Sequence, residues 1–86
     1  MTNRVYTIYN KLSQRYGEVV CFASDTMALR RICTSPLYKA SLDEIEVCRV
    51  GAIDVETGIM TAEPPVRIAI PEEFLAKADV KDKLEV

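Results

Sequence analysis

The pattern that most constrains the fold lies in residues 44–62, where two strand-like segments flank a turn. Residues 44–53 begin with a Glu-Ile-Glu-Val alternation, which is typical of a half-buried strand. Residues 54–58 supply turn chemistry, because Gly58 can adopt the positive φ that a bulged hairpin needs. Residues 58–62 then return as the partner strand. This hairpin commits the chain to an antiparallel sheet.

Two further strands and one helix are predicted before the hairpin. Residues 4–10 and 18–23 are rich in β-branched, aromatic and other apolar side chains, which favour strands. Because a short basic loop, residues 11–17, joins these two segments, we expect them to pair antiparallel. Ser24 is a good N-cap, and the apolar stripe after it predicts a helix over residues 25–34, which the following proline ends.

The segment after the hairpin is predicted from its prolines. Pro64 and Pro65 break the strand pattern, so the alternation in residues 66–70 predicts a separate edge strand. Pro71 suits the first position of a short C-terminal helix that ends near Ala78.

The expected fold class is therefore α+β: a small, mostly antiparallel β-sheet with one principal helix over about 25–34 and a short C-terminal helix. Residues 1–80 are expected to form a single compact domain, and residues 81–86 a charged, frayed tail. A chain of 86 residues buries only about 60–65% of its unfolded surface, and short strands leave open edges. We therefore expect a homodimer or a larger homo-oligomer. The expected core is Val5 or Tyr6, Ile8, Val20, Phe22, Leu29, Ile32, Val47, Val50 and Ile53.

The residue types needed for most catalytic chemistry are missing. The chain has no histidine, the commonest general base and metal ligand, and its three glycines are isolated rather than arranged in a phosphate-binding loop. Three cysteines without a CxxC pair indicate neither a disulfide framework nor a zinc site, so we expect reduced, mostly buried thiols. We predict no enzymatic activity, no cofactor, no metal and no small-molecule substrate. No segment is apolar enough for a secretory signal or a membrane span, so we expect no membrane partner and a cytoplasmic location.

Charge is distributed unevenly along the chain. The net charge of −2 and a pI near 5.1 argue against nucleic-acid binding. However, residues 1–40 hold six basic and two acidic residues, a charge of +4, while residues 41–86 hold five basic and eleven acidic residues, a charge of −6. A field divided in this way can bind a polyanion on one side.

Tyr6, Tyr9 and Tyr16 lie in the basic half beside Arg4, Lys11 and Arg15, which suggests a site for single strands. Proteins hold single strands by stacking bases on aromatic rings while basic side chains follow the backbone. The alternative is that the tyrosines merely pack and that Arg30 or Arg31 pairs with Glu44 or Glu46. If nucleic acid is bound, the expected contacts are Arg4, Tyr9, Lys11, Arg15, Tyr16, Arg30 and Arg31.

The order of these signals resembles the small non-structural protein of gokushovirus-type Microviridae, which are tiny single-stranded DNA phages. The resemblance covers about residues 4–62. It is carried by the stretch Val5-Tyr6-Thr7-Ile8-Tyr9-Asn10, by Tyr16-Gly17 and the apolar run Val20-Cys21-Phe22, by a helix with Thr26, Ala28 and Arg30, and by a hairpin over 46–58 with a Gly and an Asp-x-x-x-Gly turn.

The resemblance implies a non-virion protein made in the host bacterial cytoplasm. Its implied role is to bind single-stranded DNA or to act as an accessory in genome replication or packaging, and it brings no catalytic residues. The alternative function is a protein-interaction factor for morphogenesis or host modulation that binds no nucleic acid. That alternative is based on the acidic pI and on apolar strand residues, namely Ile45, Val47 and residues 66–70, which a partner could cover.

Overall fold

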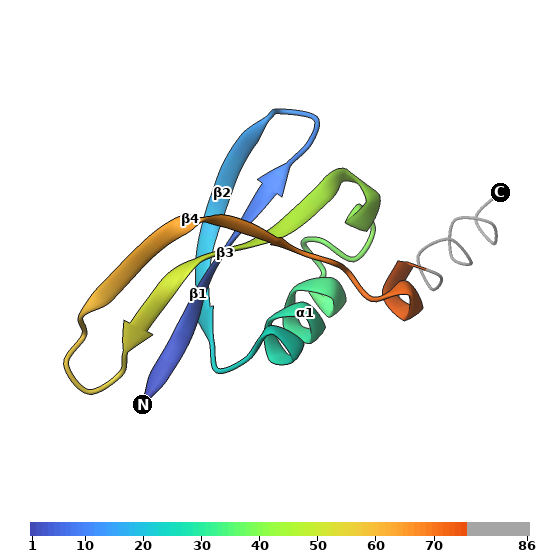
Figure 1. Ribbon diagram of the computed structural model, residues 1–86. Helices are drawn as coiled ribbons and strands as arrows, with labels where there is room; N and C mark the ends of the chain where they lie inside the picture. The colour runs from blue at the N-terminus through green and yellow to red at the C-terminus, as the bar shows by residue number, and fades with distance from the viewer. Residues whose placement is uncertain (76–86) are drawn as a thin grey trace, which may run out of the picture.

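A computed structural model describes residues 1–75 as a four-stranded antiparallel sheet with helices on one face, which confirms the α+β class (Figure 1). A helical segment begins at Glu72, and no helix within the described residues is long and apolar enough to cross a membrane. In chain order the elements are β1 (Thr2–Asn10), β2 (Arg15–Phe22), α1 (Asp25–Thr34), the short 3-10 helix η1 (Leu42–Glu44), β3 (Ile45–Asp54) and β4 (Met60–Ile68).

The strand order is β2-β1-β3-β4, and every neighbouring pair is antiparallel. β1 and β3 are therefore central, while β2 and β4 are the two edges. α1 lies against one face of the sheet, which we call the helix face (Figure 1). Leu42 of η1 and Leu75 of the last helical segment also join the core on this face. We call the opposite side of the sheet the outer face.

The principal helix begins and ends where the sequence predicts. Ser24 caps it, because its Oγ accepts a hydrogen bond from the backbone N–H of Met27 at 3.2 Å. Asp25 in the first turn favours the helix dipole. The buried side chains Ala28, Leu29, Ile32 and Cys33 recur at helical spacing, so they form the stripe that meets the sheet.

Most of the predicted core is confirmed. Tyr6, Ile8, Leu29, Ile32 and Val47 are buried in one cluster on the helix face, and Val20 and Phe22 pack against it, while Val5 is also buried. The prediction was wrong for Val50 and Ile53, which are only half-buried and lie outside the cluster. Val50 falls where the β1–β3 and β3–β4 registers shift, and Ile53 lies near the far end of β3, opposite Asn3 and Met60. Leu42, Ile45, Ala28 and Cys33 complete the core instead.

The prolines do not divide the last strand, so the prediction of two separate segments was wrong. β4 runs unbroken from Met60 to Ile68. Arg49 pairs with Val66 and Gly51 pairs with Ala62. Over this interval β4 advances by four residues while β3 advances by two, so β4 bulges there. The two prolines fall inside this bulge on an edge strand, where no ladder N–H is needed.

The first connection is also shorter than expected. The turn covers residues 11–14, and Arg15, Tyr16 and Gly17 belong to β2 rather than to a loop over 11–17. Asn10 organises the turn, because its Oδ1 accepts hydrogen bonds from the N–H groups of Leu12 and Ser13 at 2.9 and 3.0 Å. Polar residues and a glycine on a solvated edge strand were mistaken for a loop.

The second hairpin turn has the predicted chemistry. Gly58 has a positive φ of 74°, and the Asp54 carboxylate accepts hydrogen bonds from the backbone N–H groups of Glu56 and Thr57. These two hydrogen bonds lower the pKa of Asp54.

Of the cysteines, Cys33 and Cys48 are buried as expected, whereas Cys21 on β2 is exposed. The expected helix end near Ala78, the domain limit at 80 and the tail 81–86 lie outside the described residues.

Candidate nucleic-acid interface

Two of the predicted site residues form a pair of tyrosines at one end of the sheet. Tyr9 of β1 and Tyr16 of β2 are register partners, and their ring centroids lie 4.9 Å apart with the planes tilted by 53°. Tyr9 is half-buried, whereas Tyr16 is 55% exposed. An exposed ring supported from one side by a second ring can present its free surface to a planar ligand.

A bulge in β2 places both rings on the outer face. Along β1, Tyr6 and Ile8 belong to the helix-face core, so alternation puts Tyr9 on the outer face. Between the pairs Thr7↔Val19 and Tyr9↔Tyr16, β2 has one extra residue. Without that residue, Tyr16 would share a face with Val20, which packs against the core. The bulge therefore re-aims one tyrosine toward the other.

Two basic residues flank this pair at the β1–β2 turn. Lys11 is exposed but tied to η1: its backbone N–H donates to the Glu44 carbonyl at 2.8 Å, and its Nζ donates to the Asp43 carbonyl at 3.2 Å. Arg15 opens β2, is exposed, and forms no ion pair within residues 1–75. Both cations thus lie at the same end of the sheet as the tyrosine pair, although Arg15 is the register partner of Asn10, so alternation puts its side chain on the helix-face side.

The charge at this end of the sheet is mixed. Glu46 is the register partner of Tyr9 on β3, but Arg67 of β4 lies across the strand pair with its Nη1 3.6 Å from the Glu46 Oε1. The sequence reasoning did not single out Arg67. The alternation of residues 66–70 could have placed it on the face opposite Ile68, which packs against the core. Its guanidinium offsets a carboxylate that would otherwise repel a phosphate backbone.

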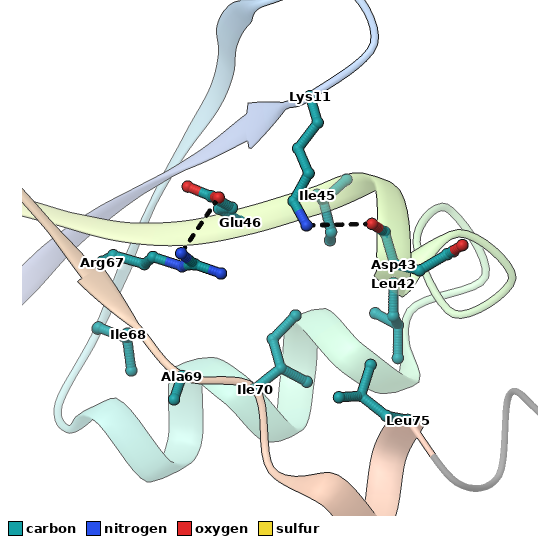
Figure 2. A pocket seen from close by; sticks show the side chains of 10 residues that line it. All are labelled: Lys11, Leu42, Asp43, Ile45, Glu46, Arg67, Ile68, Ala69, Ile70 and Leu75. Carbon is teal, nitrogen blue, oxygen red and sulfur yellow. Dashed lines mark hydrogen bonds and ion pairs between the residues drawn. The ribbon is translucent and has the colours of Figure 1, made fainter.

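A cavity of about 460 Å³ lies beside this ion pair. Figure 2 shows the side chains that line it. Its apolar wall includes Ile68, Ile70 and Leu75, and Lys11 and Arg67 reach across its rim. The lining also contains the carboxylates of Asp43 and Glu46, and the described residues hold no cluster of three metal-ligating side chains. The cavity therefore combines an apolar wall with two cations and two carboxylates.

Arg4 lies far from the tyrosine pair, in a network that fastens the helix to the sheet. The buried Tyr6 donates its hydroxyl to the Asp25 Oδ1 at 2.6 Å, and the Arg49 Nη1 lies 3.1 Å from the Asp25 Oδ2. Burial and the Asp25 carboxylate raise the pKa of Tyr6 far above its usual value. The Arg4 Nη1 lies 3.5 Å from the same carboxylate, and Arg49 also pairs with Glu63 at 3.3 Å. The charge of Arg4 is thus offset by Asp25.

Arg30 and Arg31 form a third group on the exposed side of α1. The helix buries its opposite stripe against the sheet, so these arginines lie on the reverse side of the molecule from the outer face. Within residues 1–75 neither forms an ion pair with Glu44 or Glu46. The structure therefore pairs Tyr9 with Tyr16, leaves Lys11 and Arg15 at the same end of the sheet, and separates these four residues from Arg4 and from the helix arginines.

A second tyrosine–carboxylate contact lies near the same end, on the helix face. The Tyr38 hydroxyl donates to the Glu18 Oε2 at 2.7 Å, and burial together with this carboxylate raises the pKa of Tyr38 to about 12. Glu18 is thereby held by a hydrogen bond on the side away from the tyrosine pair.

Comparison with models of known families, with curated proteins and with solved structures gave no match.

Proposed function

We propose that the protein binds single-stranded DNA through the hairpin site, which we define as Tyr9, Lys11, Arg15 and Tyr16. The observation that carries the proposal is the tyrosine pair, in which an exposed ring on the outer face rests against a half-buried one. Lys11 and Arg15 lie next to it in the chain and are exposed. This combination of an aromatic platform and adjacent cations is what sequence-tolerant single-strand binding requires.

In this proposal a base stacks on the free surface of Tyr16, while Lys11 and Arg15 contact the phosphates on either side. A stacked base contributes about 1–3 kcal/mol, and each phosphate contact contributes about −0.7 to the slope of log affinity against log salt concentration. One platform and two cations make a small site, so affinity per chain is modest and sequence preference slight. Two acidic residues, Asp43 and Glu44, lie near Lys11. They limit the area of positive potential around the site.

The biological role in this proposal is that of a non-structural accessory in the genome replication or packaging of a small single-stranded DNA phage. The protein acts in the cytoplasm of the bacterial host and has no enzymatic activity. The resemblance over residues 4–62 to the gokushovirus-type protein supports this role, and the hairpin site supplies a physical means of holding the displaced strand.

A second candidate function is a protein-interaction factor. The apolar surface first expected to serve it is not available at Ile45 and Val47, because both are buried under the helix. Other apolar side chains are exposed at the sheet edges, at Val19 and Met60. These residues favour a contact between proteins rather than with a polyanion.

Retention on immobilised single-stranded DNA over a salt gradient separates the two functions. A DNA-binding protein is retained at low salt and elutes as salt rises, and a Tyr16→Ala variant elutes earlier while remaining folded. A protein-interaction factor with a net charge of −2 passes through without retention, which would overturn the DNA proposal.

A further inference from the structure

The two edges of the sheet are protected very differently. β4 carries two adjacent prolines inside a bulge, a combination that stops another strand from pairing with it. β2 contains no proline, and Val19 to Phe22 pair regularly with β1 beyond its own bulge. An edge strand leaves a row of backbone N–H and C=O groups free, so β2 is the edge that can accept another strand.

Charge does not protect β2 either. Natural edge strands are commonly blunted by lysines or other charged side chains. After Arg15, the only charged residue of β2 is Glu18, whose carboxylate accepts a hydrogen bond from Tyr38 on the helix face. The other exposed side chains beside this edge, Val19 at 60% and Cys21, are apolar or weakly polar.

We propose that β2 pairs with β2 of a second copy of the chain, antiparallel about a twofold axis, so that two four-stranded sheets become one continuous sheet. A second copy is the occupant that fits this edge best, because antiparallel pairing about a twofold axis joins a strand to itself with matched length and no change of register. The exposed Val19 and Cys21 of each copy then lie beside their counterparts. This proposal identifies a surface for the expected homodimer and does not rest on DNA binding.

The symmetry fixes which faces meet. Directly opposed residues of an antiparallel pair share a face, and a twofold axis brings each residue at the axis opposite its own copy. The outer faces of both copies therefore lie on the same side of the joined sheet, with one tyrosine pair from each copy on that side. If the axis lies between Val19 and Cys21, the two Cys21 Cα atoms lie within about 14 Å of each other.

The first test compares two lysine substitutions by sedimentation equilibrium. Val19→Lys places like charges beside each other across the proposed axis, and we expect the dimer to weaken at least tenfold relative to the unmodified chain. Met60→Lys is the matched control, because Met60 is 55% exposed at the other edge and is a register partner of Ile53 on the same outer face. We expect the Met60→Lys variant to remain dimeric.

Three results would overturn the proposal. The unmodified chain could be monomeric at about 100 µM, Val19→Lys could remain dimeric, or both variants could dissociate, which would indicate stacking of outer faces rather than edge pairing. A spin label on Cys21 covers the case in which Val19→Lys does not fold. Cys21 is the exposed cysteine, and its side chain belongs to the outer face of the sheet. A label there therefore does not occupy the backbone groups of the β2 edge. Edge pairing predicts strong dipolar broadening between the two labels, and its absence from a dimer would contradict the proposal.

Discussion

The helix face and the outer face of the sheet are built from the same strands but serve different ends. On the helix face, Tyr6 and Val47 are completely buried beneath α1. On the outer face, Val5, Thr7 and Cys48 are buried among their neighbours at the centre, while Tyr16 and Val19 on the β2 edge stay exposed. Alternate residues of one strand belong to different faces, so the helix covers one set, while on the other face only the residues at the β2 edge stay available for recognition.

The largest expected difference between the faces is in stability. Val47→Ala removes buried methyl groups from the core and leaves a cavity, so we expect a loss of about 2 kcal/mol in the free energy of unfolding. Val19→Ala is the same substitution on the outer face, where we expect a change within about 0.5 kcal/mol. Urea denaturation of both variants at concentrations low enough to keep the chain monomeric measures the contrast. Equal losses would show that Val19 contributes as much to the folded core as Val47.

Loss of one tyrosine hydroxyl gives a smaller contrast. Tyr6→Phe removes the donor that lies 2.6 Å from Asp25, while Arg4 and Arg49 still contact that carboxylate, so we expect a loss of about 1 kcal/mol. Tyr9→Phe, on the outer face, is expected to change the free energy of unfolding by only a few tenths of a kcal/mol. The same urea measurement tests both variants. A neutral Tyr6→Phe would mean that the network does not fasten the helix to the sheet.

The smallest expected effect is the loss of stability at alkaline pH, which comes from two tyrosines on the helix face. Tyr6 and Tyr38 have raised pKa values in the folded protein, so the folded state keeps protons that the unfolded chain releases near pH 10. Their contribution to stability is complete below pH 10 and is lost as the pH rises further, by about pH 12 in the case of Tyr38. We expect unfolding midpoints in urea to fall between pH 9 and about pH 11. The Tyr38→Phe variant should show a shallower fall, and an unchanged slope would contradict the assignment.

Local signals made much of the fold predictable from the sequence. The Ser24 cap and the apolar stripe after it determine α1 within a short stretch of chain, and Gly58 with the Asp54 carboxylate determines the second hairpin turn. These features need no knowledge of distant residues. The helix bounds and the hairpin were therefore predicted correctly.

Strand order and bulges could not be read locally. Pro64 and Pro65 break a central strand but are tolerated on an edge, and only the order β2-β1-β3-β4 shows that β4 is an edge. In the same way, the side on which Tyr16 lies depends on one extra residue in β2, which pairing with β1 reveals. The sequence therefore named Tyr9 and Tyr16, which the structure pairs, but did not show that Arg4, Arg30 and Arg31 lie apart from them.

The central claim is that the hairpin site, with its tyrosine pair on the outer face, rather than the helix, holds single-stranded DNA. The direct test is fluorescence anisotropy with a labelled oligothymidine of about 12 nucleotides over a range of salt concentrations. We expect Lys11→Ala/Arg15→Ala to weaken binding and to reduce the salt slope by about 1.4, the value for two lost phosphate contacts. Arg30→Ala/Arg31→Ala removes the same charge from α1 and is expected to leave the affinity within about twofold. If the helix variant loses as much affinity as the hairpin variant, or if the unmodified chain does not bind, the claim is wrong.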